Sequence, residues 1–197
     1  MLHNMSNQLA EKLVVTGIIP SERKRVYAYG LELLIASICG IGVLILISFI
    51  LKKQFMWLSY LIAFIPLRLN AGGFHAKSHF WCIISFSSLY TILIVISSYI
   101  SNITIIPTII SLICMALVLI FAPIETKNNP LKAGREPICR RNSILLSILN
   151  LILSLSVFIF LDSIPSILIG YFSGLTAAVI FFIVVIFESI SERRKSL

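Results

Sequence analysis

Apolar residues occur in this chain as six long runs, separated by short stretches that hold most of the charged residues. A helix needs about 20 apolar residues to cross the hydrocarbon core of a bilayer. Inside lipid, each spanning segment must also satisfy its own backbone hydrogen bonds, which favours helices. The pattern predicts an all-α membrane protein, a single bundle of six transmembrane helices over residues 29–51, 54–68, 79–100, 103–122, 143–161 and 164–187.

The second run, residues 54–68, is the least regular of the six. It is only 15 residues long and has Pro66 near its end. A re-entrant hairpin is an alternative to a full crossing here.

The N-terminal segment, residues 1–20, has a different pattern. Apolar residues recur every three to four positions, at Leu2, Met5, Leu9 and Leu13. This spacing predicts a short amphipathic helix on the membrane surface. A loosely ordered tail is the alternative.

The overall composition supports a membrane protein. Hydrophobic residues make up 58% of the 197 residues and charged residues only 12%, about half of what a soluble domain carries. The four cysteines, Cys39, Cys82, Cys114 and Cys139, are scattered and do not suggest a disulfide framework. We expect residues 1–197 to form one polytopic membrane domain.

Basic residues predict the orientation. With six crossings, 14 of the 16 Lys and Arg residues fall on one side, and only Lys52 and Lys53 on the other. The positive-inside rule then places both termini in the cytoplasm. Anionic lipid explains this basic face, and an acidic peptide would also suit it. No nucleic-acid partner and no cofactor are expected.

The segment between the second and third runs, residues 68–79, carries the residues that suit catalysis. Gly72 and Gly73 allow a sharp turn and a close backbone approach. Ser78 is a candidate N-cap for the third helix, which would make Cys82 its fourth residue. A helix start stabilises a thiolate, and a protonated His75 nearby would add to this effect.

The geometry of this segment limits how the pair can meet. In one continuous helix, His75 and Cys82 would share a face with Cα atoms about 10.5 Å apart. Their side chains would lean the same way, so a hydrogen bond would be hard to make. We therefore predict a break in the helix near Ser78 that folds His75 back over the helix start.

Simpler explanations exist for each of these residues. A cysteine in a transmembrane helix is most often a small apolar residue, and Arg68 could extend to the interface. His75 and His79 are four residues apart, but no further ligands follow nearby, so no metal site is expected.

Two motifs in this sequence resemble the accessory gene regulator B (AgrB) family of bacterial quorum-sensing membrane peptidases. The first is Arg-Leu-Asn-Ala-Gly-Gly-Phe-His-Ala at residues 68–76, with a cysteine seven residues after the histidine. The second is Phe-Ala-Pro-Ile-Glu-Thr-Lys-Asn-Asn-Pro-Leu at residues 121–131. The resemblance covers most of the chain.

The resemblance implies a thiol protease that processes a small propeptide of the AgrD type into a cyclic autoinducing peptide. Cys82 would be the nucleophile and His75 the general base. Arg68 would position the substrate, and Gly73, with Gly72, would have a backbone role. Cleavage near the precursor's C-terminus would leave a thioester on Cys82, which then closes to a thiolactone or lactone.

Two further parts of the chain are candidates for roles at this site. Glu32 is a speculative acid for orienting His75, although a solvated glutamate explains it as well. The basic loop 123–142 is either a docking surface for the propeptide or a segment that sets topology.

Two other functions are alternatives to a peptidase. A peptide export factor or transporter without a peptidase step is the main alternative, but the later spans have few ionisable groups. A non-catalytic scaffold would not need Cys82. Gly170 and Gly174 form a Gly-x-x-x-Gly pattern that suits either a homodimer interface or packing within the bundle.

Overall fold

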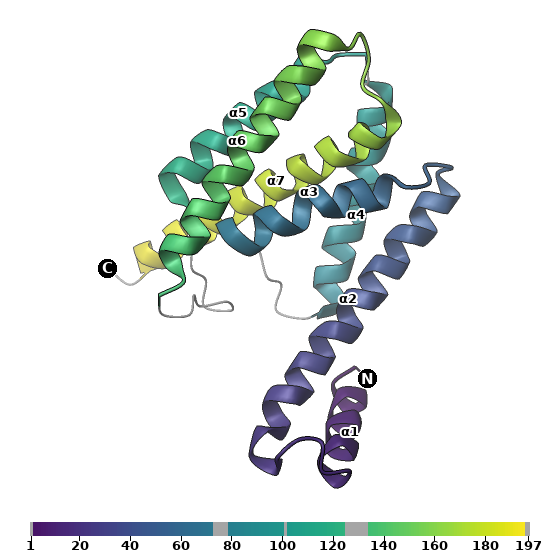
Figure 1. The fold of residues 1–197 in the computed structure, drawn as a ribbon, viewed down its shortest axis with the longest axis vertical. Helices are drawn as coiled ribbons and strands as arrows, with labels where there is room; N and C mark the ends of the chain where they lie inside the picture. The colour runs from purple at the N-terminus through teal and green to yellow at the C-terminus, as the bar shows by residue number, and fades with distance from the viewer. Residues whose placement is uncertain (1, 73–78, 101, 125–133, 196–197) are drawn as a thin grey trace. The chain divides into compact units, whose positions relative to one another are not determined.

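The computed structural model describes residues 2–72, 79–100, 102–124 and 134–195, and every regular element in these ranges is a helix. In chain order, the elements are α1 (Leu2–Val15), the 3-10 helix η1 (Ser21–Arg23), α2 (Lys24–Ile50), α3 (Met56–Ala71), α4 (His79–Tyr99), α5 (Ile105–Phe121), α6 (Glu136–Phe160) and α7 (Ser166–Lys195) (Figure 1). The six predicted runs correspond to α2–α7. The all-helical prediction is confirmed.

Four helices are long and apolar enough to cross a membrane, and they lie within Ser21–Ile50, Phe80–Tyr99, Glu136–Phe160 and Ser166–Ser191. The other two apolar helices, α3 and α5, have 16 and 17 residues. A helix of that length spans about 24 Å, less than the hydrocarbon core of about 30 Å. The chain is therefore a helical membrane protein, and the six crossings stay a prediction.

The segment predicted as either a short span or a hairpin is one continuous helix, α3. Pro66 lies inside it and the chain does not reverse there. Proline lacks the backbone N–H that would bond the carbonyl of residue 62. The Asn70 side chain donates a hydrogen bond of 2.8 Å to the Pro66 carbonyl.

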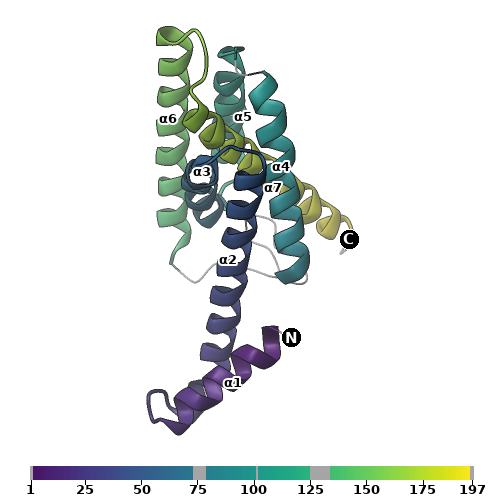
Figure 2. The same cartoon turned by 90° about the vertical axis from the view of Figure 1, so that its right-hand side faces the viewer.

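The described chain divides into two compact units. The N-terminal unit comprises residues 1–46 and 76–87, and the bundle unit comprises residues 47–75 and 88–197. In the bundle unit, α3 packs against α7 and α5 packs against α6, with further contacts between α3 and α6 and between α5 and α7 (Figures 1 and 2).

Two glycines on α7 allow its backbone to approach α3 closely. A Cβ atom on Gly170 would lie 2.6 Å from the Met56 carbonyl oxygen, and one on Gly174 would lie closer still to the Tyr60 carbonyl oxygen. Small residues permit such approaches between membrane helices. The Gly-x-x-x-Gly pattern therefore serves packing within the bundle, a choice that the sequence had left open.

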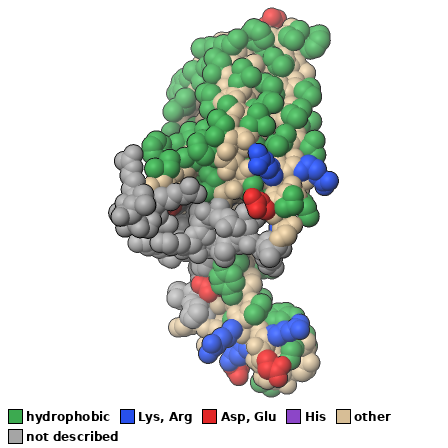
Figure 3. Space-filling model, turned by 90° about the vertical axis from the view of Figure 1, so that its left-hand side faces the viewer, with side chains coloured by type: hydrophobic (Ala, Val, Ile, Leu, Met, Phe, Trp, Pro, Cys, Tyr) green, Lys and Arg blue, Asp and Glu red, His purple; other side chains and the backbone are tan. Residues whose placement is uncertain are grey.

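Helix α6 buries several serine side chains and exposes many of its large apolar ones. Ser143, Ser147 and Ser154 are fully buried, whereas Leu149 and Ile159 are exposed. Hydrophobic side chains cover the face that α5 and α6 present in Figure 3. This arrangement reverses that of a soluble helix and suits a lipid environment, where internal hydrogen bonds hold the helices together.

The N-terminal unit contains the predicted amphipathic helix. α1 buries Ser6 and Ala10, whereas Met5 and Leu9 are exposed. An ion pair between Glu11 and Lys24 joins α1 to the start of α2. The helix is confirmed in place of a loose tail, and its position on a membrane surface stays a prediction.

Candidate active site

The first motif begins within a helix rather than in the loop predicted over residues 68–79. α3 continues to Ala71, so Arg68, Leu69 and Asn70 are also helical. None of these four residues opposes helix formation, and the helix ends only at Gly72, which has a φ of +96°. The turn predicted at the glycines therefore begins at Gly72, and Gly73 lies outside the described residues.

Two features of the backbone explain why residue 72 is a glycine. Its φ is in a region that other residues rarely adopt. In addition, a Cβ atom there would lie 2.6 Å from the carbonyl oxygen of Ile124. A side chain at this position would displace the backbone of the segment that follows α5.

The two motifs meet at this point. The Ile124 N–H donates a hydrogen bond of 3.1 Å to the Ala71 carbonyl oxygen. This bond joins the segment after α5 to the last turn of α3, directly before Gly72. Two stretches about fifty residues apart in the sequence thus form one backbone junction.

A side-chain contact that the sequence did not reveal supports the same helix end. The Asn142 side chain donates a hydrogen bond of 3.1 Å to the Asn70 side chain, and it comes from α6. The basic loop predicted over 123–142 is shorter than expected, because α6 begins at Glu136 with Pro137 in its first turn, where proline is well tolerated. In the sequence, this contact is marked by an asparagine just after the second apolar run and another just before the fifth.

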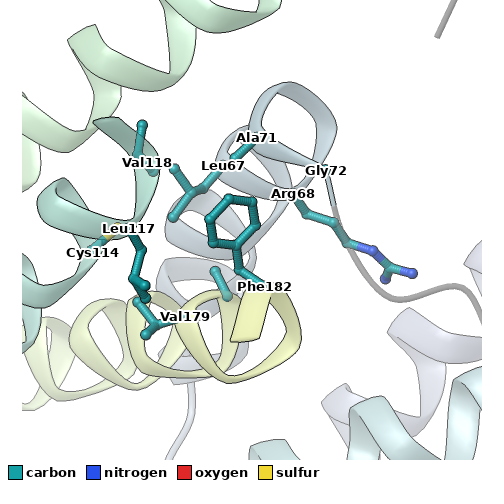
Figure 4. Close-up of a pocket in the computed structure, with 10 residues that line it drawn as sticks. Leu67, Arg68, Ala71, Gly72, Cys114, Leu117, Val118, Val179 and Phe182 are labelled. Carbon is teal, nitrogen blue, oxygen red and sulfur yellow. The ribbon is translucent and has the colours of Figure 1, made fainter. Parts of the chain in front are cut away.

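Arg68 lies on α3 one turn before Gly72 and is half-buried. Its guanidinium carbon is 5.5 Å from the centroid of the Phe64 ring and 5.9 Å from that of Phe181 on α7. Figure 4 shows its side chain pointing away from the apolar residues that lie beside it (Figure 4).

Those apolar residues line a small pocket between α3, α5 and α7, which has room for about one water molecule. Leu67, Ala71, Cys114, Leu117, Val118, Val179 and Phe182 form most of its wall. The pocket is too small to hold a peptide side chain as it stands.

Cys82 is the fourth residue of α4, as the sequence predicts, because that helix begins at His79. It is half-buried and is not in a disulfide. Its position in the first turn places it near the positive end of the helix dipole. The predicted base His75, the N-cap Ser78 and the break between them lie outside the described residues.

Glu32 is in the third turn of α2 and is half-buried. It belongs to the N-terminal unit, as Cys82 does, whereas Arg68 and Gly72 belong to the bundle unit. In the described part of the chain, no three His, Cys, Asp or Glu side chains gather closely enough to hold a metal ion.

Comparisons with known proteins identify the family of this chain. The family model described as Accessory gene regulator B matches residues 4–191. Two curated relatives, each named Accessory gene regulator protein B, come from Staphylococcus aureus strains MW2 and MRSA252. They are 30% and 28% identical to this chain over 128 residues, which is 65% of this chain and 68% of each relative. No solved structure matches the chain. A match to the family model over nearly the whole chain, which includes both motifs at the α3 junction, shows that this protein belongs to the accessory gene regulator B family.

Proposed function

We propose that this protein is a membrane-embedded cysteine endopeptidase that cleaves a quorum-sensing propeptide and promotes its cyclisation. Membership in the accessory gene regulator B family supports a role in quorum-sensing peptide processing. The observation that carries the cysteine mechanism is the position of Cys82 in the first turn of α4. Of the other three cysteines, Cys39 and Cys114 lie in the middle of helices. Cys139 is likewise the fourth residue of its helix, α6, but it is buried, whereas Cys82 is half-buried.

The reaction has two acyl-transfer steps. The Cys82 thiolate attacks the carbonyl carbon of a peptide bond near the precursor's C-terminus, and protonated His75 gives its proton to the leaving amine as the C–N bond breaks. The remaining peptide is then a thioester on Cys82. A cysteine or serine within the peptide attacks this thioester, which closes a thiolactone or lactone ring and frees the Cys82 sulfur.

Arg68 and the two glycines would support this chemistry from the end of α3. A guanidinium binds a carboxylate through two parallel hydrogen bonds, so Arg68 suits an acidic part of the propeptide. Gly72, held against Ile124, would set the direction in which the chain leaves α3 toward Gly73 and His75. Glu32 stays a speculative partner for His75.

The orientation is part of the same proposal. With six crossings in a single polytopic domain, both termini and the α3–α4 connection would face the cytoplasm of the bacterial cell membrane. The exposed Arg135, Arg140 and Arg141 at the start of α6 would face the same side and belong to the segment 123–142 proposed for docking. α1 would lie on the membrane surface with Met5 and Leu9 toward lipid. A homodimer, if formed, would use a surface other than the Gly170 and Gly174 positions, since α3 covers these.

Co-expression with a precursor peptide encoded by a neighbouring gene tests the mechanism. We expect the unmodified protein to release the C-terminal tail and to form a peptide adduct that maps to Cys82 by mass spectrometry. His75→Ala and Cys82→Ala should both fail, and Cys39→Ala, which removes an exposed cysteine from α2, should cleave normally. If Cys82→Ala still releases the tail, the nucleophile is assigned wrongly and an export factor becomes the better explanation.

A further inference from the structure

The guanidinium of Arg68 rests on two aromatic rings that come from different helices. Phe64 precedes Arg68 by four residues on α3, so the two side chains share one helix face. Phe181 reaches the same guanidinium from α7. The two rings contact each other at 66°, with centroids 5.7 Å apart. We call Phe64 and Phe181 the aromatic seat.

The aromatic seat packs against further aromatic side chains. Phe64 is only 1% exposed and stacks on Tyr60, which is fully buried. Tyr60 in turn meets Tyr90 of α4 edge to face, at 4.9 Å between centroids, and Tyr90 shares a hydrogen bond with Ser48. Phe64, Tyr60 and Tyr90 thus form a continuous series of ring contacts beneath the guanidinium. Because Phe64 and Tyr60 are buried, the aromatic seat has little freedom to move.

This arrangement has a chemical consequence for Arg68. An arginine cation is attracted to the face of an aromatic ring, and its N–H donors lie in the plane of the guanidinium. Contact with the two rings therefore holds the guanidinium through its charge, and the contact itself does not use those donors.

We propose that Phe181, together with Phe64, is a positioning residue that holds Arg68 ready to bind a carboxylate of the propeptide. The inference rests on the proposed function, because it needs a peptide substrate with an acidic part. It goes further by assigning a role to α7, a helix that carries neither sequence motif. Phe181 does not touch the reacting atoms in this proposal and acts only through Arg68.

Phe181 is the better of the two positions to test, because it is half-buried while Phe64 belongs to the core. Phe181→Met keeps similar bulk but has no ring face, and Phe181→Trp restores one. Phe172→Met is a matched control, because Phe172 is a buried phenylalanine of the same helix that contacts Tyr171. Thermal unfolding of each detergent-purified, full-length variant shows which of them fold.

The first measurement is binding, made in the Cys82→Ala background so that it does not depend on catalysis. The probe is a fluorescent synthetic peptide of the precursor's acidic C-terminal region, and a second peptide has its carboxylates replaced by amides. We expect Phe181→Met to weaken binding of the acidic peptide by about threefold to thirtyfold. Phe181→Trp and Phe172→Met should bind normally, and the amide peptide should not distinguish any of them.

The second measurement is cleavage with Cys82 restored. A positioning role predicts that Phe181→Met raises KM for the acidic precursor and leaves kcat within about twofold. Unchanged binding and KM in a folded Phe181→Met variant would overturn the inference, as would equal losses in Phe172→Met. Absence of a Cys82 adduct in the unmodified protein would instead overturn the proposed function, whatever the binding data show.

Discussion

The end of α3 and the start of α4 both carry residues predicted for catalysis, but they are built in different ways. At the end of α3, three residues contact other parts of the bundle unit: Gly72 lies against Ile124, Asn70 bonds Asn142 of α6, and Arg68 contacts Phe181 of α7. At the start of α4, Cys82 gains its expected reactivity from its place in the first turn of its own helix. The end of α3 therefore depends on tertiary packing, whereas the start of α4 depends on local sequence.

The difference implies that the two regions respond differently to substitution. A change at the start of α4 should alter the chemistry and leave the fold intact. A change at the end of α3 should alter the fold and the activity together, because several helices meet there.

The largest effect on activity is expected from Cys82→Ala. Removal of a catalytic nucleophile should lower the cleavage rate by at least about a thousandfold. The free energy of unfolding should change by no more than about 1 kcal/mol, because the side chain is small and half-buried. Tail release and thermal unfolding, measured on the same preparation, test both parts. A large loss of stability would mean that Cys82 has a packing role.

Gly72→Ala should lower stability and activity together. The new Cβ would impose strain at a φ of +96° and would collide with the Ile124 carbonyl, at a cost of about 3 kcal/mol or more. Gly134→Ala is the matched control, because Gly134 has a φ of +81° but no described residue lies within 4 Å of its Cβ position. It should cost only about 1–2 kcal/mol. The free energy of unfolding of both variants is measured by denaturant unfolding. Equal decreases would mean that the contact with Ile124 does not contribute to the effect of Gly72→Ala.

Gly174→Ala tests a packing contact away from the catalytic residues. The Cβ would meet the Tyr60 backbone, and the overpacking should cost about 1–3 kcal/mol. In contrast, Gly42→Ala on α2 has open space at its Cβ position and should stabilise its helix by roughly 0.5–1 kcal/mol. A shift in oligomeric state without a loss of stability in Gly174→Ala would indicate that this face contacts a second copy instead of α3.

The smallest effect is expected from the hydrogen bond between Asn142 and Asn70. Side-chain hydrogen bonds between membrane helices contribute about 0.6 kcal/mol on average. A double-mutant cycle with Asn142→Ala, Asn70→Ala and the double variant isolates this coupling. Because Asn70 also donates to the Pro66 carbonyl, Asn70→Ala alone should cost more than Asn142→Ala. A coupling energy near zero would show that the contact does not stabilise the junction.

Much of this protein could be predicted from its sequence, because membrane helices are encoded by local composition. The six apolar runs became α2–α7, and the start of α4 fell at His79, where a polar segment gives way to an apolar run. The family motifs were also visible without coordinates. These features depend on residues that are neighbours in the chain, so the sequence displays them directly.

The rest was decided by tertiary structure. α3 extends four residues into the predicted loop. A Cβ atom at position 72 would collide with the backbone of Ile124, about fifty residues away in the sequence. The partner of Gly170 and Gly174 proved to be α3 of the same chain, and the rings beneath Arg68 come partly from α7. In each case the deciding contact joins segments far apart in the sequence. The physical reason is that apolar helices of similar composition could pair in many ways, and only close packing of particular small, polar and aromatic side chains selects one of them.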